Sequence, residues 1–423
     1  MSKIAVIGTG YVGLTTGACF AHIGHEVVCA DIDPDKVARL QAGEVPILEA
    51  GLDNLVAEGI DSGRLSFVVG AEGAASDCEF AYLCVPTPQA EDGSADLSYI
   101  EAAARQIGPV LPSEAIVVNK STVPVGSTRV VERALGRADV SVVSNPEFLR
   151  EGSAVHDFLH PDRIVIGAED QGAAVRVSSL YLGITAPVIV TDPASAETIK
   201  YAANAFLATK ISFINAVAAV CEAVGADIKD VALGMGYDSR IGHEFLKPGP
   251  GFGGSCFPKD SRALVRIAEK AGYDFGLLKG VITVNAEQFE RVTEKIVDLA
   301  GGSVDGVRIA AWGLTFKART DDLRDSPALE ITRRLVERGA VVRGHDPSRP
   351  GPIDGIEVVD DPYVAVEDAQ VLAILTEWDE FRWHDIDKVA GLMASLRVVD
   401  ARNLLDRTAL VRRGFEYRGV GLS

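Results

Sequence analysis

The sequence has few cysteines, and they are arranged neither as metal ligands nor as a disulfide framework. Among 423 residues there are six cysteines and seven histidines. The cysteines are Cys19, Cys29, Cys78, Cys84, Cys221 and Cys256. No two of them are spaced as CxxC and no histidine cluster accompanies them, which argues against a zinc site and against a small disulfide-rich scaffold. We therefore expect no metal and a reducing, cytoplasmic location.

Positive charge is also scarce. The chain has 41 Lys and Arg against 60 Asp and Glu, a formal net charge of −19. Such a balance makes non-specific binding to nucleic acid unfavourable. A phosphorylated ligand would need a local cluster of Lys and Arg, and the motifs below supply candidates for one.

Targeting and membrane signals are missing as well. The first eight residues lack the basic region and the cleavage site of a signal peptide, and their apolar run leads directly into a glycine-rich turn. The most membrane-like stretch, residues 205–224, carries Lys210, Asn215 and Glu222. We expect a buried helix there and not a membrane span. With 47% hydrophobic and 24% charged residues, the chain is typical of a globular protein with two or three domains.

The amino-terminal segment predicts a dinucleotide-binding fold. Residues 3–7 form an apolar strand, a glycine motif follows, an apolar helix runs to about residue 23, and a second strand, 26–30, ends at Asp31. The motif consists of Gly8, Thr9, Gly10, Tyr11, Val12 and Gly13. In this context the first two glycines permit the turn and the approach of a pyrophosphate, and the third permits helix–strand packing. Asp31 can accept both ribose hydroxyls and would repel a 2′-phosphate, so NAD is favoured over NADP.

Further strands are expected at residues 80–85, 115–119, 140–144 and 163–166, giving a doubly wound parallel sheet up to about residue 190. Ligands bind at the carboxyl ends of such strands. A helical stretch follows from 194 to about 230 and is apolar nearly all round, which is typical of a helix buried between layers or subunits. Glu197, Lys200 and Asn204 project from one of its faces. They are either buried polar groups at a domain interface or part of a site.

A second α/β unit is expected from about residue 303. A strand over residues 306–312, a helix with Ser326 as its N-cap and Pro327 at its first position, and a strand over 340–344 precede Asp346. Strands 371–375 and 397–399 extend it. The order matches the amino-terminal unit but lacks the glycine motif, so we interpret it as a nucleotide-type domain adapted to another ligand.

Residues 249–260 present a single thiol beside two charged groups. Cys256 follows Gly251, Gly253 and Gly254, and it precedes Lys259 and Asp260 at the expected start of a helix. The helix dipole and Lys259 would favour a thiolate there. A buried structural cysteine is the alternative, and the neighbouring residues favour a covalent catalyst. Cys84 is the one rival thiol.

Over essentially the whole chain, these patterns resemble the UDP-glucose/GDP-mannose dehydrogenase family. The matching blocks are Gly8–Gly13, Lys120–Gly126, Asn145–Gly152, Glu197–Asn204, Asp238–Gly242, Gly251–Asp260, Gly313–Lys317 and Thr320–Arg324. The resemblance implies an α/β fold with two Rossmann-like domains joined by a long central helix and a small helical domain. The implied boundaries are an NAD-binding domain at 1–193, a central helical dimerisation domain at 194–300 and a UDP-sugar-binding domain at 301–423.

The resemblance also implies an activity, which is the NAD-dependent four-electron oxidation of UDP-glucose at C6 to UDP-glucuronate. Cys256 would form the thiohemiacetal and then the thioester. Lys200 and Asn204 would stabilise the oxyanion, Asp260 and Lys200 would order a water, Glu147 would act as the base in hydrolysis, and Thr122 would complete the catalytic set. GDP-mannose or a UDP-N-acetylhexosamine is the alternative substrate, and a non-catalytic nucleotide-sugar sensor is a remote alternative.

By the same resemblance, the NAD contacts would be Gly8, Gly10, Tyr11, Val12, Gly13, Asp31, Lys36, Thr87, Thr122, Glu151, Lys259 and Arg324. The substrate contacts would be Phe148, Leu149, Arg150, Lys200, Asn204, Arg240, Phe245, Leu246, Lys247, Gly249, Gly251, Phe252, Gly253, Phe316, Lys317 and Arg402. Arg240 would come from a neighbouring subunit of a homodimer or higher homo-oligomer. No nucleic acid, membrane or metal partner is expected.

Overall fold

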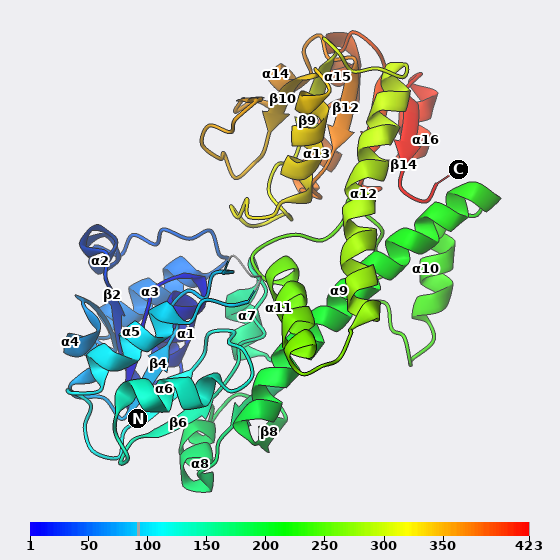
Figure 1. Cartoon of the computed structure of the whole chain (residues 1–423). Helices are drawn as coiled ribbons and strands as arrows, with labels where there is room; N and C mark the ends of the chain where they lie inside the picture. Colours follow the sequence, from blue (N-terminus) through cyan, green and yellow to red (C-terminus); the bar gives the residue numbers. More distant parts are fainter. Residues whose placement is uncertain (91–93, 423) are drawn as a thin grey trace. The chain divides into compact units, whose positions relative to one another are not determined.

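The computed structural model describes residues 1–90 and 94–422. The chain divides into two compact units. The first unit comprises Met1–Ala203 and Arg266–Ala271, and the second comprises Asn204–Val265 and Gly272–Ser423. Each unit contains one sheet (Figure 1). The division into three domains at residues 193 and 300 stays a prediction.

The first unit is an eight-stranded sheet flanked by helices, with the strand order β3-β2-β1-β4-β5-β6-β7-β8. Its elements are β1 (Lys3–Ile7), α1 (Tyr11–His22), β2 (Glu26–Asp31), α2 (Pro34–Gln41), α3 (Leu52–Asp61), β3 (Leu65–Val69), α4 (Ala71–Ala75), β4 (Phe80–Leu83), α5 (Ser98–Ile107), β5 (Ile116–Asn119), α6 (Ser127–Leu135), β6 (Ser141–Ser144), α7 (Ala154–Leu159), β7 (Ile164–Gly167), α8 (Gln171–Ser179), β8 (Val188–Thr191) and the start of α9 (Pro193–Val224). The chain order reverses between β1 and β4, which is the topological switch point where ligands of such sheets bind.

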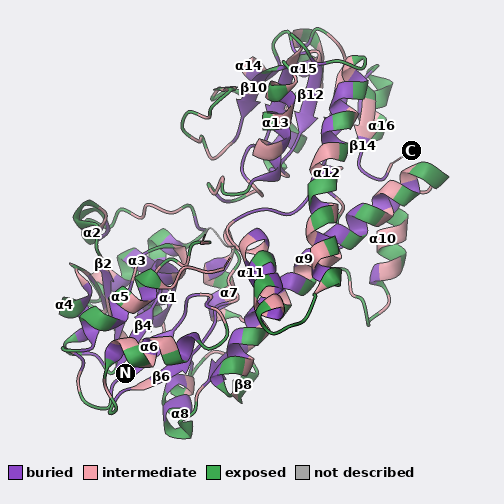
Figure 2. Cartoon of the chain, in the orientation of Figure 1, coloured by how far each residue is buried: buried purple, intermediate pink, exposed green. Residues whose placement is uncertain are grey.

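The sheet differs from the expected one at its far edge. The strands predicted from residue 3 to residue 144 are present and parallel, but β7 pairs antiparallel with β6 through Ser144 and Gly167 only. The unpredicted β8 then pairs parallel with β7. Strand β3 was not among the strands that the sequence analysis expected. Both faces of the sheet are buried (Figure 2), because one cluster contains Leu14, Phe20 and Tyr181 and another contains Ile100 and Val131.

The second unit contains a six-stranded parallel sheet with the order β11-β10-β9-β12-β13-β14. Its elements after α9 are α10 (Ile228–Gly236), α11 (Phe257–Lys270), α12 (Gly276–Ala300), β9 (Arg308–Trp312), α13 (Pro327–Glu337), β10 (Val341–His345), β11 (Ile356–Val358), α14 (Pro362–Val366), β12 (Val371–Ile374), a 3-10 helix (Asp379–Trp383), α15 (Ile386–Leu392), β13 (Arg397–Asp400), α16 (Arg407–Arg412) and β14 (Glu416–Gly419). The doubly wound fold expected here is confirmed, with β11 and β14 as unpredicted edge strands.

The predicted start of α13 is confirmed. Ser326 occupies the N-cap position and Pro327 begins the helix, although the Ser326 side chain makes no capping hydrogen bond. Its hydroxyl donates to the Leu314 carbonyl at 2.7 Å. The hydroxyl therefore ties the start of α13 to the turn after β9 and gives that buried carbonyl a donor.

Helix α9 contributes to both units. By length and composition alone it would suit a membrane span, and 33% of its most apolar stretch is buried inside the chain. Its polar side chains bind within the units: Glu197 binds the start of α6, and the Asn215 side-chain oxygen accepts from the Gly249 amide at 2.9 Å. It is therefore a core helix, as expected, although Phe206 and Phe213 are 65% and 53% exposed.

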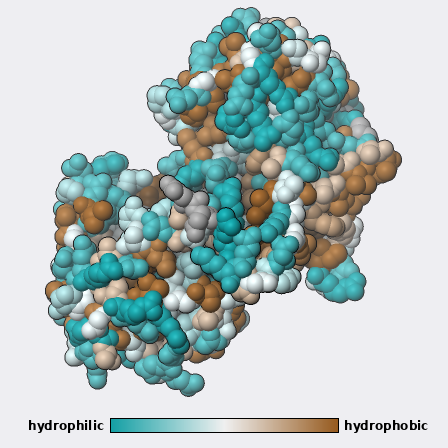
Figure 3. All heavy atoms as spheres, viewed as in Figure 1, coloured by the Kyte–Doolittle hydropathy of each residue, from teal (hydrophilic) through white to brown (hydrophobic). Residues whose placement is uncertain are grey.

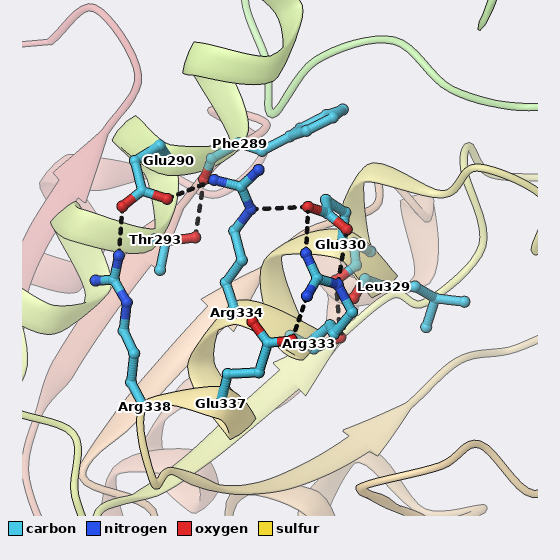
Figure 4. A network of polar contacts seen from close by, with 11 residues as sticks. Phe289, Glu290, Thr293, Leu329, Glu330, Arg333, Arg334, Glu337 and Arg338 are labelled. Atoms are coloured by element: carbon cyan, nitrogen blue, oxygen red, sulfur yellow. Dashed lines mark hydrogen bonds and ion pairs between the residues drawn. The ribbon is translucent and has the colours of Figure 1, made fainter.

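An ionic network joins α12 to α13 in the second unit (Figure 4). Glu290 on α12 accepts from Arg334 and Arg338 on α13. Arg334 also donates to Glu330 at 2.8 Å. Partial burial would raise the pKa of Glu290, but the two arginines hold it below its usual value. The carboxylate thus contributes stability above its unfolded pKa of about 4.3, and that contribution is lost as the pH falls through its lower folded pKa.

We predict that Glu290→Gln destabilises the second unit by about 1 kcal/mol at pH 7, since the network is partly exposed and screened by solvent. All three tryptophans, Trp312, Trp378 and Trp383, lie in this unit, so their fluorescence reports its unfolding. The midpoint should fall by about 2 °C to 4 °C, and the difference should shrink below about pH 4. Glu337→Gln, which removes an outer partner of Arg333, should have less effect. Equal midpoints for wild type and Glu290→Gln at pH 7 would contradict the prediction.

Candidate active site

The glycine motif lies at the switch point of the first sheet. Gly8 has φ +98°, and a Cβ there would approach the Cys84 carbonyl oxygen to 2.8 Å. A Cβ on Gly13 would approach the Gly8 carbonyl oxygen to 1.9 Å. Gly10 has no atom within 4 Å of its Cβ position. The first and third glycines therefore serve packing, and the second leaves open space at the start of α1, which fits a pyrophosphate on the helix N-terminus.

Asp31 closes β2 beside this motif. One of its oxygens accepts from the Thr9 amide at 3.0 Å, the Thr9 hydroxyl at 2.5 Å and Lys36 Nζ at 3.1 Å. The other accepts from the Asp33 amide at 3.2 Å. Burial alone would raise the pKa of Asp31, but these hydrogen bonds and the Lys36 charge lower it to about 2. Asp31 is therefore anionic at any ordinary pH, and it is held at the strand end where a ribose would bind.

The turn after β6 carries a buried ion pair. Glu147 accepts from Lys200 Nζ, on α9, at 2.9 Å, and its second oxygen accepts from the Leu149 amide at 2.6 Å. Both side chains are about 5% exposed. A buried carboxylate and a buried ammonium stabilise each other only in such a paired and hydrogen-bonded arrangement. Glu147 and Lys200 thus form a buried ion pair in the first unit.

The next residues of this turn face two cations. The Arg163 guanidinium stacks on the Phe148 ring with a centroid distance of 3.8 Å, and Lys200 Nζ lies 5.4 Å from the same centroid. Arg150 donates to Asp157 through its side chain at 2.6 Å and its amide at 2.9 Å. Arg163 lies beside the predicted Phe148, and the sequence analysis did not identify it.

Glu197 fixes the loop that follows β5. It accepts from the Gly126 amide at 2.6 Å, the Thr128 amide at 3.0 Å and the Thr128 hydroxyl at 2.9 Å. Thr122 lies in this loop, and its carbonyl accepts from the Thr87 hydroxyl at 2.9 Å. Burial raises the pKa of Glu197 despite these donors. The two predicted threonines are thus neighbours, and Glu197 has a positioning role.

In the second unit, Cys256 directly precedes α11, and its carbonyl accepts the Asp260 amide at 2.8 Å. The thiol lies at the helix N-terminus, as the sequence predicts. The Asp260 carboxylate accepts from Asn204 on α9 at 2.7 Å and from Lys259 at 2.6 Å. Asn204 and Asp260 are 6% and 0% exposed. Cys256 therefore directly precedes a helix whose first turn contains a buried carboxylate with two partners.

Polar side chains of α9 and α12 hold the loop before Cys256. The Asn285 side chain exchanges two hydrogen bonds with the Phe252 backbone, at 2.8 and 3.0 Å, and Gln288 donates to the Gly249 carbonyl at 2.8 Å. A Cβ on Gly253 would approach the Asp325 carbonyl to 2.0 Å, and one on Gly251 would meet Phe289 at 2.7 Å. The glycines of this loop are thus required by close packing.

The second sheet presents Arg402 at its carboxyl edge. Its guanidinium donates to the Leu375 carbonyl at 3.0 Å and to the Phe316 carbonyl at 3.1 Å, and it lies 3.4 Å from a Cβ position on Gly249. Lys317 Nζ lies 5.3 Å from the Phe316 ring centroid. Arg402, Phe316, Lys317 and Gly249 are therefore brought together, as a predicted sugar-nucleotide site requires.

The remaining predicted residues are more exposed or peripheral. Arg240 and Arg324 are 86% and 66% exposed in their side chains, and each pairs with an aspartate two residues earlier. Leu246 is buried and Phe245 has φ +64°. The remaining contacts stay predictions at their positions: Tyr11 and Val12 begin α1, Lys36 lies on α2, Glu151 follows β6, and Lys247 is exposed in the loop before Cys256.

The other thiols are unsuited to nucleophilic work. Of the six cysteines, all in the described part of the chain, Cys256 alone is not buried. Burial raises the pKa of Cys84 to about 12, with Lys120 opposing the shift. Burial likewise raises the pKa values of Cys19 and Cys78 to about 12. Cys84 is therefore no rival, because the thiolate is the reactive form.

One residue that the sequence analysis missed is Glu49, in the segment between α2 and α3. It is 6% exposed and accepts hydrogen bonds from Tyr11, Gly152 and Ala154. Its partners are 38 to 105 residues away in sequence. No local pattern could have identified it, since its segment has no helical or strand period.

A glycine turn at the switch point of a doubly wound sheet, with an anionic Asp31 at the end of the next strand, defines a dinucleotide-dependent oxidoreductase class. The comparisons with known proteins make the class specific. Three parts of the UDP-glucose/GDP-mannose dehydrogenase family match in order: the NAD binding domain at residues 2–185, the central domain at 194–287 and the UDP binding domain at 310–407. The chain belongs to this family.

Individual relatives match over the full length. The chain is 46% identical to a UDP-glucose 6-dehydrogenase of Rhizobium meliloti, covering 99% of both chains. It is 47% identical to UDP-glucose 6-dehydrogenase TuaD of Bacillus subtilis, covering 100% of this chain and 93% of that one. The structure of a UDP-glucose dehydrogenase from Pyrobaculum islandicum is 40% identical and superposes with a TM-score of 0.93, covering 100% of this chain and 98% of that chain.

We predict that Asp31→Ala weakens NAD binding by about tenfold to a hundredfold, because a charged hydrogen-bond acceptor at the ribose is lost. The preference for NAD over NADP should fall at the same time, since the repulsion of a 2′-phosphate disappears. Titration of each cofactor by protein fluorescence measures both effects. Asp35→Ala, on the exposed first turn of α2, is the control. An unchanged ratio of the two dissociation constants would refute the ribose assignment.

Proposed function

We propose that the protein oxidises the C6 hydroxyl of UDP-glucose to the carboxylate of UDP-glucuronate, with reduction of two NAD. The observation that carries this proposal is the position of Cys256 at the start of α11, one turn before the buried Asp260 that Asn204 and Lys259 bind. The family membership and the names of the full-length relatives reported above support the same reaction.

The thiol answers a chemical requirement of a four-electron oxidation. An alcohol can lose hydride and a proton to give an aldehyde, but the aldehyde carbon cannot lose another hydride until a nucleophile has added to it. The Cys256 sulfur would form a C–S bond with that carbon, and the oxygen would become the thiohemiacetal hydroxyl. Loss of a second hydride and a proton leaves a thioester. Water then breaks the C–S bond, releases the carboxylate and restores the thiol.

Two polar side chains of α9 are proposed to stabilise the charge that develops on the oxygen. Asn204 and Lys200 lie one turn apart on α9 and carry donors, and a single oxyanion donor is typically worth about 3 kcal/mol in such a site. Asp260 and Lys200 are proposed to order the water that takes the first alcohol proton. Thr122 is proposed as a further member of the catalytic set. Glu147 is proposed as the base that activates water against the thioester.

NAD, when bound, supplies the hydride acceptor for both oxidations. The glycines of the Gly8–Gly13 turn, Asp31 and Lys36 would hold its phosphates and adenosine ribose, as the open space over Gly10 and the anionic Asp31 allow. Thr87, Thr122, Glu151, Lys259 and Arg324 are the further contacts proposed by motif. The chain's own role is to hold the reactive carbon and to move protons.

The nucleotide sugar is proposed to bind through basic and aromatic groups of the motifs. In the second unit, Arg402, Lys317 and Phe316 lie around the second sheet's edge. Phe148, Leu149 and Arg150 in the first unit are further contacts proposed by motif. UDP-glucose is favoured over GDP-mannose and UDP-N-acetylhexosamines because the relatives at 46% and 47% identity carry the UDP-glucose name.

Turnover with a panel of nucleotide sugars tests the proposal. UDP-glucose should yield two NADH per sugar and a uronate, and GDP-mannose should be turned over at least about a hundredfold less efficiently, since a wrong base leaves buried polar groups unpaired. A higher kcat/KM with GDP-mannose would replace the substrate assignment. Binding without NADH formation would favour a nucleotide-sugar sensor instead.

We predict that Cys256→Ala lowers uronate formation by at least about a thousandfold, because the acyl–sulfur step is removed. NAD affinity should stay within about twofold of wild type, since the proposed cofactor contacts are left in place. Mass spectrometry of quenched wild-type enzyme should detect an acyl adduct on the peptide containing Cys256. Cys84→Ala is the control and should retain turnover. Full uronate production by Cys256→Ala would refute the covalent step.

We further propose that the chain works as a homodimer through the exposed apolar side of α9. Figure 3 shows hydrophobic surface over the carboxyl-terminal part of α9 and over α10. Phe213, Val220 and Val224 on α9 and Leu233 on α10 are all more than half exposed. Apolar surface of this kind marks an interface. A neighbouring copy could then supply Arg240, which is 86% exposed.

The expected mass in solution is at least twice that of one chain, measured by light scattering. Phe213→Glu places a charge on the proposed interface and should shift the protein towards monomer, because burying an unpaired charge is costly. Trp383→Glu changes an aromatic far along the chain that is 83% exposed, against 53% for Phe213, and is the control. A monomeric wild type would refute the proposal.

A further inference from the structure

Glu49 connects two loops of the first unit that carry different proposed tasks. One of its oxygens accepts from the Tyr11 hydroxyl and from the Gly152 amide at 2.7 Å. The other accepts from the Ala154 amide at 2.8 Å. Tyr11 belongs to the dinucleotide turn, and Gly152 ends the turn that begins at Glu147. The carboxylate is therefore shared between the cofactor loop and the turn of the proposed substrate contacts.

The Glu49 carboxylate is a buried acceptor with three hydrogen-bond donors. Glu49 is 6% exposed, so its charge is held by hydrogen bonds and not by water. Burial and the neighbouring carboxylate raise the pKa of Tyr11, which keeps the phenol protonated as a donor. The Tyr11 hydroxyl also lies 2.9 Å from the Arg150 carbonyl. The dinucleotide turn thus reaches the substrate turn both directly and through Glu49.

The substrate turn needs an outside partner to keep its shape. Gly152 has φ +81°, a backbone conformation that favours glycine, and Ala154 begins α7 with an amide that has no helical acceptor. Asp157 on α7 holds Arg150, while Glu49 accepts from both the Gly152 and the Ala154 amides. Without Glu49 the buried Ala154 amide and the partly buried Gly152 amide would lose this acceptor.

We propose that Glu49 is a positioning residue that couples the two ligands of the first unit: NAD on the Gly8–Gly13 turn orders the Glu147–Gly152 turn through Tyr11 and Glu49, and so strengthens nucleotide-sugar binding. This inference rests on the proposed function for its second ligand. The coupling is reciprocal, so the sugar nucleotide strengthens NAD binding by the same factor.

Glu49→Gln tests the proposal, because the amide keeps the size of the side chain but presents N–H groups to at least one of its donors. The dissociation constant of NAD is measured with and without saturating UDP-glucuronate, the proposed product, because UDP-glucose and NAD together would be turned over. Wild type should show a coupling factor of about tenfold, and the variant a factor close to one. KM for UDP-glucose should rise about tenfold while kcat falls less, a split that simple loss of folded protein would not produce.

A second readout uses NAD alone. Hydrogen exchange of the segment 148–155 should slow when NAD binds to wild type and should be unaffected by NAD in Glu49→Gln. This result stands even if UDP-glucose proves not to be the substrate, so failure of the inference and failure of the proposed function are distinguishable. Equal slowing by NAD in wild type and variant would overturn the coupling.

Two further variants complete the design. Tyr11→Phe removes only the hydroxyl, keeps the backbone of the dinucleotide turn and should also reduce the coupling factor. It provides the test if Glu49→Gln does not fold. The double variant should lose no more coupling than Glu49→Gln alone, because both act on one connection. Glu44→Gln, in the same segment but exposed and paired with Arg39, is the matched control and should behave as wild type. Wild-type coupling in Tyr11→Phe would refute the role of the hydroxyl and with it the proposed path.

Discussion

Carboxylate oxygens that accept backbone N–H groups hold the turns at the carboxyl edges of both sheets, and the site depends on this interaction. Asp31 takes the Thr9 amide, Glu147 the Leu149 amide and Glu197 the Gly126 amide in the first unit. In the second unit Asp346 takes the Leu314 and Thr315 amides. A chain that leaves a parallel strand in a sharp turn loses its ladder partners, and an unpaired buried amide costs about 1 to 3 kcal/mol. Buried acids supply the acceptors, so part of the chain's negative charge is structural.

In both sheets an aspartate binds a threonine of the turn after the first strand, but the two aspartates differ in exposure. Asp31 ends β2 and Asp346 directly follows β10. Each accepts from the amide and hydroxyl of a threonine in the turn after the first strand of its sheet. Asp31 keeps a half-buried position beside Lys36, where a ribose can reach it. Asp346 is 1% exposed and also accepts from the Trp378 indole at 3.1 Å. The second edge is therefore closed to a dinucleotide ribose, which fits the proposal that this sheet, without the glycine motif, binds another ligand through Arg402.

Features set by neighbouring residues could be predicted from the sequence. The strand, glycine turn, helix and Asp31 follow one another within the first 31 residues, and the position of Cys256 at a helix start depends on residues 251–260 alone. Features set by distant contacts could not. The antiparallel direction of β7 depends on how the chain returns to the sheet after α7. The hydrogen bond of the Ser326 hydroxyl depends on the Leu314 carbonyl. The role of Glu49 depends on partners that are distant in sequence, such as Gly152. An acid in an irregular segment gives no periodic signal, although it holds the turn on which the proposed chemistry relies.

The uneven burial of the cysteines has a consequence for the protein's exposure to reagents. Five thiols are enclosed in the cores of the two units, while Cys256 is partly accessible at a helix start. A small alkylating agent or peroxide added to the folded chain would therefore be directed to one sulfur in six. Under the proposed mechanism, each modified thiol would correspond to one inactivated chain, and oxidative damage would stop turnover before it loosened the fold.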